Sequence, residues 1–266
     1  MKIKEFIGDL GHYQVVKTED GHETLKSEYF DEACHSTSGA WEETKYNYFE
    51  GTKVLEKYCS DEILELTIFE VGFALGLGPH VVFNELEKLN IKKKVTFISC
   101  ELDLSFIKWT LNKSHFSEYL KSKNAKITES KNYFEVHWKN FSLFIIKGDI
   151  ENTMDVISLI TDNKIDCVFH DPFSPNKNPN LWTVEFFNHL KIFLKNDVIL
   201  STYSSAVRFR KALLKSGFYI RARKGFGRKR TMTLASLDST FADQEVMKQV
   251  ENANVEPFIK NEMKDE

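Results

Sequence analysis

Cysteine and proline are scarce in this chain, and long apolar runs are missing. Only four of its 266 residues are cysteines, and none forms a CxxC pair, which argues against a disulfide framework and favours a reducing, cytoplasmic setting. Nowhere do about 18 apolar residues follow one another, as a membrane-spanning helix requires. We therefore expect a cytoplasmic protein without a membrane partner. The eight histidines show no metal-ligand spacing, so no metal site is predicted.

A strong charge of one sign is also missing. The formal net charge is −3, so no global basic field would attract nucleic acid, and such a partner would have to meet a local patch. The sequence contains no Walker loop and no Gly-x-Ser-x-Gly elbow. With 42% hydrophobic residues, the chain can bury the core of one elaborated domain or of a domain with a small appendage.

The hydrophobic pattern from residue 66 onward is typical of an α/β fold. Apolar stretches that read as strands alternate with stretches of helical spacing, which predicts βαβ units and a parallel sheet. The predicted strands are 66–71, 95–99, 141–147, 165–169 and 197–203, and the predicted helices are 80–89, 104–111, 152–160, 182–194 and 205–215.

Both ends of the chain have a different pattern. Residues 1–60 are rich in aromatics, and their pattern predicts a hairpin around Asp20-Gly21, so we expect a small β-rich appendage there. Residues 61–238 form the main domain, and 239–266 form a charged tail. Within the main domain, 218–221 and 231–237 should pair as an antiparallel hairpin, as should 133–137 and 141–145. A mostly parallel sheet with a terminal antiparallel hairpin is the arrangement of Rossmann-like S-adenosylmethionine-dependent methyltransferases.

Polar and glycine residues follow the first three predicted strands of the main domain. The first strand leads into Gly72 and Gly76, and glycines at such a turn let the backbone approach a ligand. The second strand ends at Glu101, where an acid can accept hydrogen bonds from ribose hydroxyls, and the third leads to Asp149, placed to meet an adenine amino group. Each acid alone could be a surface carboxylate. Together they predict an adenosyl ligand.

The fourth predicted strand ends in Asp171, which is followed by a proline-rich loop. Three of the five prolines in the chain, at 172, 175 and 179, stiffen this loop. A rigid loop that holds one carboxylate at a strand end favours a catalytic role for Asp171. The competing interpretations are an N-cap for the helix near Trp182 and a turn-forming Asp-Pro pair. His170 is left out of the catalytic set, because a histidine at a strand end is more often packed.

The run 221–230 concentrates positive charge around two glycines and one phenylalanine. A solvated hairpin tip is the simpler interpretation. The interleaved aromatic, together with a lysine on the proline-rich loop that should face the same side of the sheet, favours contact with RNA phosphates. The residues predicted to bind RNA are Lys177, Lys224, Phe226, Arg228, Lys229 and Arg230.

Several of these stretches match one known family. The strongest are the run from Asp171 through Pro179 to Trp182, residues 202–205 and the basic run 224–230; looser matches lie at Glu70-x-Gly72-Phe73, Gly76-Leu77, 29–31 and 43–46. On these motifs the chain resembles the methyltransferase domain of MnmC-like tRNA-modifying enzymes.

The resemblance implies a Rossmann-like enzyme that methylates tRNA. Its reaction would move a methyl group from S-adenosylmethionine to the aminomethyl group on carbon five of a wobble uridine, with Asp171 near the reacting amine. Many relatives carry a fused flavin-dependent oxidase domain, which nothing in this chain could form, so no flavin is expected. The implied cofactor-binding residues are Glu70, Gly72, Phe73, Gly76, Glu101 and Asp149.

The chain departs from the family at its glycine loop. Where relatives usually have Gly-Phe-Gly-Thr-Gly, this sequence has Gly72-Phe73-Ala74-Leu75-Gly76. Two other functions therefore stay open. A small-molecule alkyltransferase resembling the aminopropyltransferases would use the same sheet and acids without needing the basic run. A non-catalytic RNA-binding relative would keep the basic run but not the cofactor. The sequence does not indicate an oligomeric state.

Overall fold

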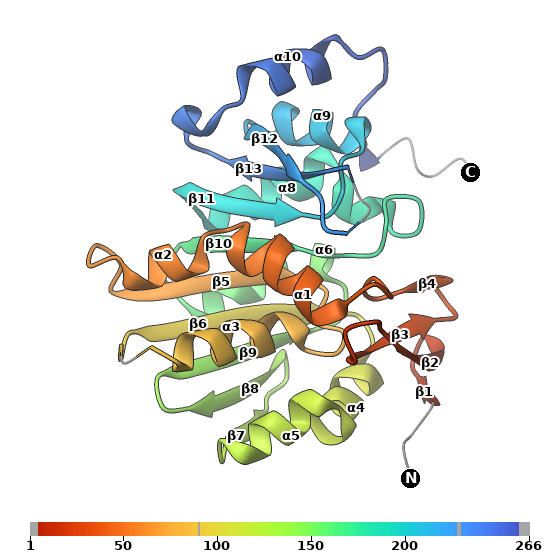
Figure 1. Ribbon diagram of the computed structural model, residues 1–266, viewed down its shortest axis with the longest axis vertical. Helices are drawn as coiled ribbons and strands as arrows, with labels where there is room; N and C mark the ends of the chain where they lie inside the picture. The colour runs from red at the N-terminus through yellow and green to blue at the C-terminus, as the bar shows by residue number, and fades with distance from the viewer. Residues whose placement is uncertain (1–4, 90, 228–229, 261–266) are drawn as a thin grey trace.

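The computed structural model describes residues 5–89, 91–227 and 230–260, which form two sheets. The large sheet has nine strands in the order β12-β13-β11-β10-β5-β6-β9-β8-β7, and the small sheet has four in the order β1-β2-β3-β4. The small sheet lies beside the large sheet, on the side toward which the arrow of β11 points (Figure 1). In the described ranges, no helix is long and apolar enough to cross a bilayer.

Five parallel strands form the centre of the large sheet. They are almost entirely buried, so their sequences read as continuous apolar runs rather than alternating ones. All five predicted strands are confirmed. In sheet order they are β11 (Leu194–Thr202), β10 (Ile165–His170), β5 (Glu65–Val71), β6 (Lys94–Glu101) and β9 (Phe141–Lys147).

Antiparallel strands complete both sides of the large sheet. On one side β12 (Tyr219–Lys224) pairs with β13 (Thr231–Ser236), which pairs with β11. On the other side β8 (Tyr133–Trp138) pairs with β9 and with β7 (Lys126–Glu129). Both predicted hairpins are therefore confirmed, as is the Rossmann-like methyltransferase fold with its terminal antiparallel hairpin.

Helices cover both faces of the large sheet, and each face has its own apolar core. One predicted helix is broken, because 152–160 is divided between α6 (Ile150–Thr153), a 3-10 turn η2 (Met154–Val156) and α7 (Ile157–Ile160). The predicted helix 182–194 is helical only as α8, with a 3-10 turn on each side. The other bounds are α3 Leu77–Glu87, α4 Leu104–Lys113, α5 His115–Ser122, η3 Pro179–Trp182, α8 Val184–Leu190, η4 Lys191–Phe193 and α9 Val207–Lys215.

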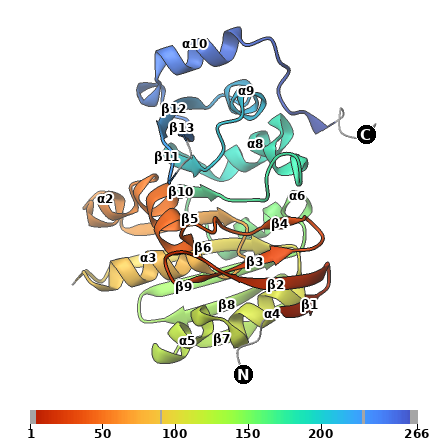
Figure 2. The same ribbon diagram turned by 45° about the vertical axis from the view of Figure 1, so that its right-hand side comes forward.

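The first sixty residues form two structures instead of one β-rich unit. The predicted hairpin is present, and Figure 2 shows the small sheet crossing in front of the large one near α4. The following helices pack into the core of the main domain, where Tyr48, Val54 and Tyr58 are buried. The elements are β1 Glu5–Gly8, β2 Gly11–Lys17, β3 Glu23–Ser27, β4 Glu32–Ala33, α1 Ala40–Thr44, the π-helix η1 Lys45–Glu50 and α2 Val54–Cys59.

The segment expected to be a charged tail is docked onto the main domain. After the short turn η5 (Ser239–Phe241), the helix α10 (Gln244–Asn252) lies next to α9 (Figure 1) and buries Val250. Beyond it, the carbonyl of Phe258 accepts a hydrogen bond from the backbone of Val184 at 3.0 Å. Residues 239–260 therefore contribute to the core on the α8–α9 face.

Candidate active site

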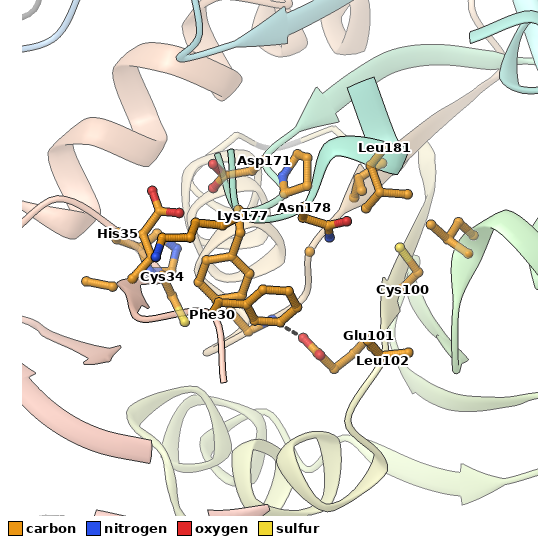
Figure 3. A pocket seen from close by; sticks show the side chains of 18 of the residues that line it. Phe30, Cys34, His35, Cys100, Glu101, Leu102, Asp171, Lys177, Asn178 and Leu181 are labelled. Atoms are coloured by element: carbon orange, nitrogen blue, oxygen red, sulfur yellow. Dashed lines mark hydrogen bonds between the residues drawn. The ribbon is translucent and has the colours of Figure 1, made fainter. Parts of the chain in front are cut away.

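A cavity of about 640 Å³ opens where β5, β6, β9 and β10 end (Figure 3). Its walls come from these strand ends, from the proline-rich loop after Asp171, from residues 29–37 of the small sheet and its following loop, and from α1 and η1. The volume lies within the usual range of cofactor and ligand sites. The place is the one at which open α/β sheets bind ligands.

The structure brings five of the predicted site residues together in this cavity. Gly72, Glu101, Asp149, Asp171 and Lys177 all line it. They come from four strand ends and one loop, so their meeting depends on the parallel sheet.

Three predicted cofactor residues do not line the cavity. The Glu70 carboxylate is buried and accepts a hydrogen bond from the Ser99 hydroxyl at 2.7 Å. Burial raises the pKa of Glu70 well above its usual value. Phe73 is 1% exposed in the core, and Gly76 lies so close to Phe116 that an added Cβ would come within 2.6 Å of its ring. These three residues can shape the loop, but their side chains do not face a ligand in this cavity.

The loop from Gly72 to Gly76 has positive φ angles typical of glycine, also at Ala74. Gly72 has φ +99°, and an added Cβ would lie 2.8 Å from the carbonyl oxygen of Asp171, so only glycine lets these two loops approach. Ala74, at the family's glycine position, has φ +44°. The backbone N–H of Ala74 donates to the Glu101 carboxylate at 3.1 Å. The altered loop thus holds the acid that the sequence assigns to the ribose.

Glu101 is held by the backbone on both sides. Besides Ala74, the N–H of Asp103 donates to its other carboxylate oxygen at 3.1 Å. Burial raises the pKa of Glu101 to about 7. Because of this pKa, Glu101 can change its ionisation near neutral pH. Figure 3 shows Glu101 and Asp171 on the walls of one cavity.

Asp149 has a structural task that its sequence position did not reveal. It is the N-cap of α6, because one carboxylate oxygen accepts from the N–H of Glu151 at 3.0 Å. The other oxygen accepts from the side-chain amide of Asn152 at 2.8 Å. Asp149 still lines the cavity, so a contact with an adenine amino group would have to share these oxygens.

The side chain of Asp171 is held by a tyrosine that lies 123 positions earlier in the sequence. The Tyr48 hydroxyl donates to its Oδ1 at 2.5 Å, and the Asp171 N–H extends the sheet by donating to the carbonyl of Val71 at 3.1 Å. The N-cap interpretation is wrong, because the cap of α8 is Thr183. Asp171 is therefore positioned by the sheet and by Tyr48.

His170 is packed, as expected. Its ring is fully buried among aromatic side chains, with the Trp182 ring centroid 4.6 Å away. Burial lowers the pKa of His170 to about 3, so the ring stays neutral. It belongs to the core on the α8–α9 face.

The turn that leads into β4 is fastened to the proline-rich loop. The rings of Phe30 and Phe173 stack at 4.2 Å, and Glu32 accepts hydrogen bonds from the N–H and the hydroxyl of Ser174 at 3.0 and 2.9 Å. Lys177 lies 3.7 Å from a carboxylate oxygen of Asp31. These contacts join two walls of the cavity. Lys177 is thus paired within the protein and still 40% exposed.

The basic hairpin lies outside the cavity but at the same edge of the sheet. β12 runs parallel to β11 through their shared partner β13, so its end at Lys224 lies at the edge where β11 ends. Lys224 and Arg230 are exposed and Phe226 is half-buried. The carbonyl of Lys224 accepts a hydrogen bond from the Tyr46 hydroxyl at 3.0 Å. The predicted residues Arg228 and Lys229 lie outside the described residues.

The cavity is acidic. Among its lining residues that the structure describes, six carboxylates face one lysine, and burial lowers the pKa of the one histidine, His35, to about 4. An acidic wall favours cationic ligands. No group of three or more His, Cys, Asp or Glu side chains within the described ranges is arranged to hold a metal ion. The carboxylates belong to Glu32, Glu43, Glu101, Asp149, Glu151 and Asp171.

Some site residues were not identified from the sequence. Tyr48 and Tyr203 line the cavity, and the Tyr203 hydroxyl donates to the carbonyl of Pro172 at 2.9 Å. Phe30 and Glu43 also line it, and they lie in the stretches 29–31 and 43–46 that the family resemblance matched loosely. Tyr203 lies in the stretch 202–205, which the resemblance matched more strongly, whereas Tyr48 lies outside every matched stretch.

Comparisons with known proteins give consistent results. Residues 112–238 match a family described as S-adenosyl-L-methionine-dependent methyltransferase. An uncharacterized protein of Methanocaldococcus jannaschii is 31% identical, over 85% of this chain and 60% of that protein. The "tRNA 5-methylaminomethyl-2-thiouridine biosynthesis bifunctional protein MnmC" of Leptospira interrogans is 31% identical, over 83% of this chain and 35% of its own length.

A solved structure extends the similarity to nearly the whole chain. MNMC2 from Aquifex aeolicus superposes with a TM-score of 0.74 and 28% identity, covering 96% of this chain and 81% of that one. The resemblance to the MnmC methyltransferase domain is therefore confirmed, and so is the fold of an S-adenosylmethionine-dependent methyltransferase. This chain spans only about a third of the length of its Leptospira relative, at 35%.

Proposed function

We propose that this relative of the MnmC methyltransferases is a tRNA-modifying enzyme. It would transfer a methyl group from S-adenosylmethionine to the amine of 5-aminomethyl(-2-thio)uridine at the wobble position, giving 5-methylaminomethyl(-2-thio)uridine. The observation that carries the proposal is the placement of Glu101 and Asp171 on the walls of one acidic cavity at the carboxyl edge of the sheet. The similarity to MnmC proteins over most of the chain supports the choice of substrate.

The residues around the cavity fit S-adenosylmethionine. Glu101 lies at the end of β6 and can accept hydrogen bonds from both ribose hydroxyls. Gly72 lets the loop after β5 lie against Asp171, because an added Cβ would come within 2.8 Å of the Asp171 carbonyl oxygen. A positively charged sulfonium suits an acidic wall. The cofactor would supply a methyl group bonded to that sulfur, and the protein would supply orientation and charge.

Asp171 is the proposed catalytic residue. An alkyl amine with a pKa of about 10 is protonated at neutral pH, and only its neutral form is a nucleophile. Because the acidic wall also favours the protonated amine, a proton acceptor must lie close to the nitrogen, and Asp171 can fill that role. As methyl transfer proceeds, positive charge arrives on the nitrogen. A nearby carboxylate stabilises that charge more in the transition state than before it.

The basic hairpin would bind the tRNA backbone. Lys224 and Arg230 are exposed at the edge of the sheet where the cavity opens, so phosphates held there would lie near the cavity. Phe226 offers a ring for base stacking, and Lys177 could exchange its partner Asp31 for a phosphate. This arrangement favours a tRNA substrate over a polyamine, which would not need the hairpin. We include Arg228 and Lys229 in this surface from their sequence positions alone.

Mass analysis of nucleosides tests the reaction. tRNA carrying 5-aminomethyl(-2-thio)uridine, incubated with the protein and S-adenosylmethionine, should yield the methylaminomethyl nucleoside, whereas a polyamine in its place should stay unmodified. Cofactor binding by calorimetry distinguishes the non-catalytic alternative. If tRNA is not methylated although the cofactor binds, the proposed reaction is wrong.

Asp171→Asn tests the catalytic role, because it keeps the shape but removes the proton-accepting charge. Turnover should fall by roughly 10² to 10⁴ fold. Cofactor affinity, measured by calorimetry, should stay close to that of the wild type. A variant with near wild-type turnover would give Asp171 a structural role only.

A further inference from the structure

We propose that Tyr48 is a positioning residue for the methyl transfer, which fixes the Asp171 carboxylate and sets its basicity. This inference rests on the proposed function and names a residue that neither the motifs nor the sequence periodicity identified. Tyr48 would act through Asp171 without itself taking a proton from the substrate.

The geometry of Tyr48 leaves it little freedom. Its hydroxyl donates to Oδ1 of Asp171 at 2.5 Å, and its ring stacks on Phe169 with the centroids 5.5 Å apart. The side chain is 2% exposed. Because Phe169 belongs to β10 and Asp171 directly follows that strand, the Tyr48 side chain contacts both the strand and the carboxylate after it.

The backbone under Tyr48 is equally constrained. Tyr48 belongs to the π-helix η1. Such wide turns are rare in proteins, and those that occur are often found at functional sites. The Ser201 hydroxyl of β11 donates to the carbonyl of Asn47. At Gly51 an added Cβ would lie 2.0 Å from that carbonyl oxygen and 2.7 Å from the Ser201 hydroxyl. Only glycine therefore allows η1 to approach the sheet closely enough for Tyr48 to reach Asp171.

The surroundings of Tyr48 keep its hydroxyl protonated, so that it donates its hydrogen bond to Asp171. Burial, followed by the neighbouring Asp171 carboxylate, raises the pKa of Tyr48 well above its usual value, so the phenol keeps its proton at working pH. A hydrogen bond donated to a carboxylate stabilises the ionised form. Among the described residues, the titratable groups that interact electrostatically with Asp171 include Tyr48 of η1, Tyr203 after β11, Glu70 of β5 and Cys34 after β4. Glu32, Glu43 of α1, Glu101 and Lys177 of the proline-rich loop line the same cavity.

The test is Tyr48→Phe, with the pH profile of turnover as the readout. Turnover on aminomethyl tRNA should fall roughly 10- to 100-fold. The acidic limb of the profile should move to higher pH, because the carboxylate loses a donor that favours its ionised form. Cofactor affinity should stay within about twofold. A turnover loss without movement of the acidic limb overturns the proposal.

Tyr58→Phe is the matched control. Tyr58 is as buried as Tyr48, and its hydroxyl donates to the carbonyl of Ile91 at 2.9 Å, away from the cavity. The same substitution there should leave both turnover and the acidic limb unchanged. A similar pH shift in both variants would mean that loss of any buried tyrosine hydroxyl produces the effect, which overturns the assignment to Tyr48.

A double-mutant cycle tests whether Tyr48 acts through Asp171. In the Asp171→Asn background, Tyr48→Phe should change turnover by less than about threefold. Equal losses in both backgrounds overturn the proposal. If Tyr48→Phe does not fold, 3-fluorotyrosine at position 48 keeps the shape and strengthens the donor, so the acidic limb should move to lower pH; no movement overturns the proposal.

Failure of the proposed function would be distinguishable from failure of this inference. If the wild type methylates no tRNA, carbon-13 NMR can still compare the pKa of the Asp171 carboxyl in the wild type and in Tyr48→Phe. A higher pKa in the variant supports the role of Tyr48 in setting basicity. An equal pKa overturns it, whatever the substrate of the enzyme.

Discussion

At the scale of single residues, Glu101 combines two properties that usually exclude each other. Burial raises its pKa to about 7, yet two backbone N–H groups point at its oxygens. A carboxylate accepts hydrogen bonds from ribose hydroxyls best when it is ionised. Below pH 7 the protein must therefore lose a proton from Glu101 before the ribose is bound well.

We expect cofactor affinity to depend on pH through Glu101. Affinity should rise roughly tenfold between pH 6 and pH 8, because the ionised fraction of a group with a pKa of about 7 rises by that factor. Calorimetry in buffers of different ionisation heats should detect proton release at pH 6. Glu101→Gln should remove this dependence, and Glu101→Ala should weaken binding by roughly 1.5 to 3 kcal/mol. Affinity that is flat with pH in the wild type would argue against the ribose contact.

Ala74 offers a second test at this scale. Its φ of +44° is left-handed, which costs an L-residue roughly 1 to 2 kcal/mol, whereas glycine there costs roughly 0.5 to 1 kcal/mol of chain entropy. Ala74→Gly should therefore leave the free energy of unfolding equal or raise it by up to about 1 kcal/mol. Ala242, which is half-buried like Ala74 and has φ −58°, is the control, and Ala242→Gly should destabilise, because at negative φ glycine adds only chain entropy to the unfolded state. Urea unfolding measures both. A clear loss of stability in Ala74→Gly would contradict strain at this position.

The residues that the sequence located are those whose position follows from strand order. Carboxyl ends of neighbouring parallel strands share one edge, so Gly72, Glu101 and Asp171 could be brought together without coordinates. The direction of Glu70 could not be predicted, because β5 is buried along almost its whole length and shows no alternation. Tyr48 could not be predicted either, since its partner lies 123 positions away.

At the scale of elements, strands were predicted better than helices. A strand buried on both faces has a short apolar run with sharp ends, as β10 does. The region 150–160 carries helical spacing, but Asp149 begins a helix of only four residues that passes into a 3-10 turn. The π-helix η1 has no periodicity signal, and its contact with β11 joins Ser201 to Asn47 across 154 positions of sequence. The docking of α10 rests on few apolar residues in a charged segment.

We expect α10 to contribute to stability although its sequence is mostly charged. Val250 is 4% exposed between α10 and the main domain. Val250→Ala should lower the free energy of unfolding by roughly 1.5 to 2.5 kcal/mol, measured by urea unfolding. Val255→Ala removes the same atoms from a residue that is 40% exposed, so its effect should stay within about 0.5 kcal/mol. Equal stability of both variants would mean that α10 is not docked in solution.

At the scale of the whole molecule, charge is separated along one edge of the sheet. The cavity is lined by six carboxylates and one lysine, whereas the hairpin after β12 exposes Lys224 and Arg230. The net charge of −3 hides this separation. It could be predicted in part, because the basic run is visible in the sequence. The acidic lining could not, since Glu32, Glu43 and Glu151 meet only through the fold.

This separation predicts that tRNA binding depends on salt through the hairpin. In the double variant Lys224→Ser with Arg230→Ser, each lost phosphate contact should lower the magnitude of the slope of log affinity against log salt by roughly 0.7 to 0.9. Cofactor affinity and the order of preference among tRNAs should not change. Lys215→Ser, at the end of α9 and exposed, is the control and should leave the slope unchanged. Filter-binding titrations across a salt series provide the measurement. If the double variant folds and binds tRNA as the wild type does, the RNA surface lies elsewhere. The next candidate is the set of aromatic residues in the first sixty, where stacking would make binding less sensitive to salt.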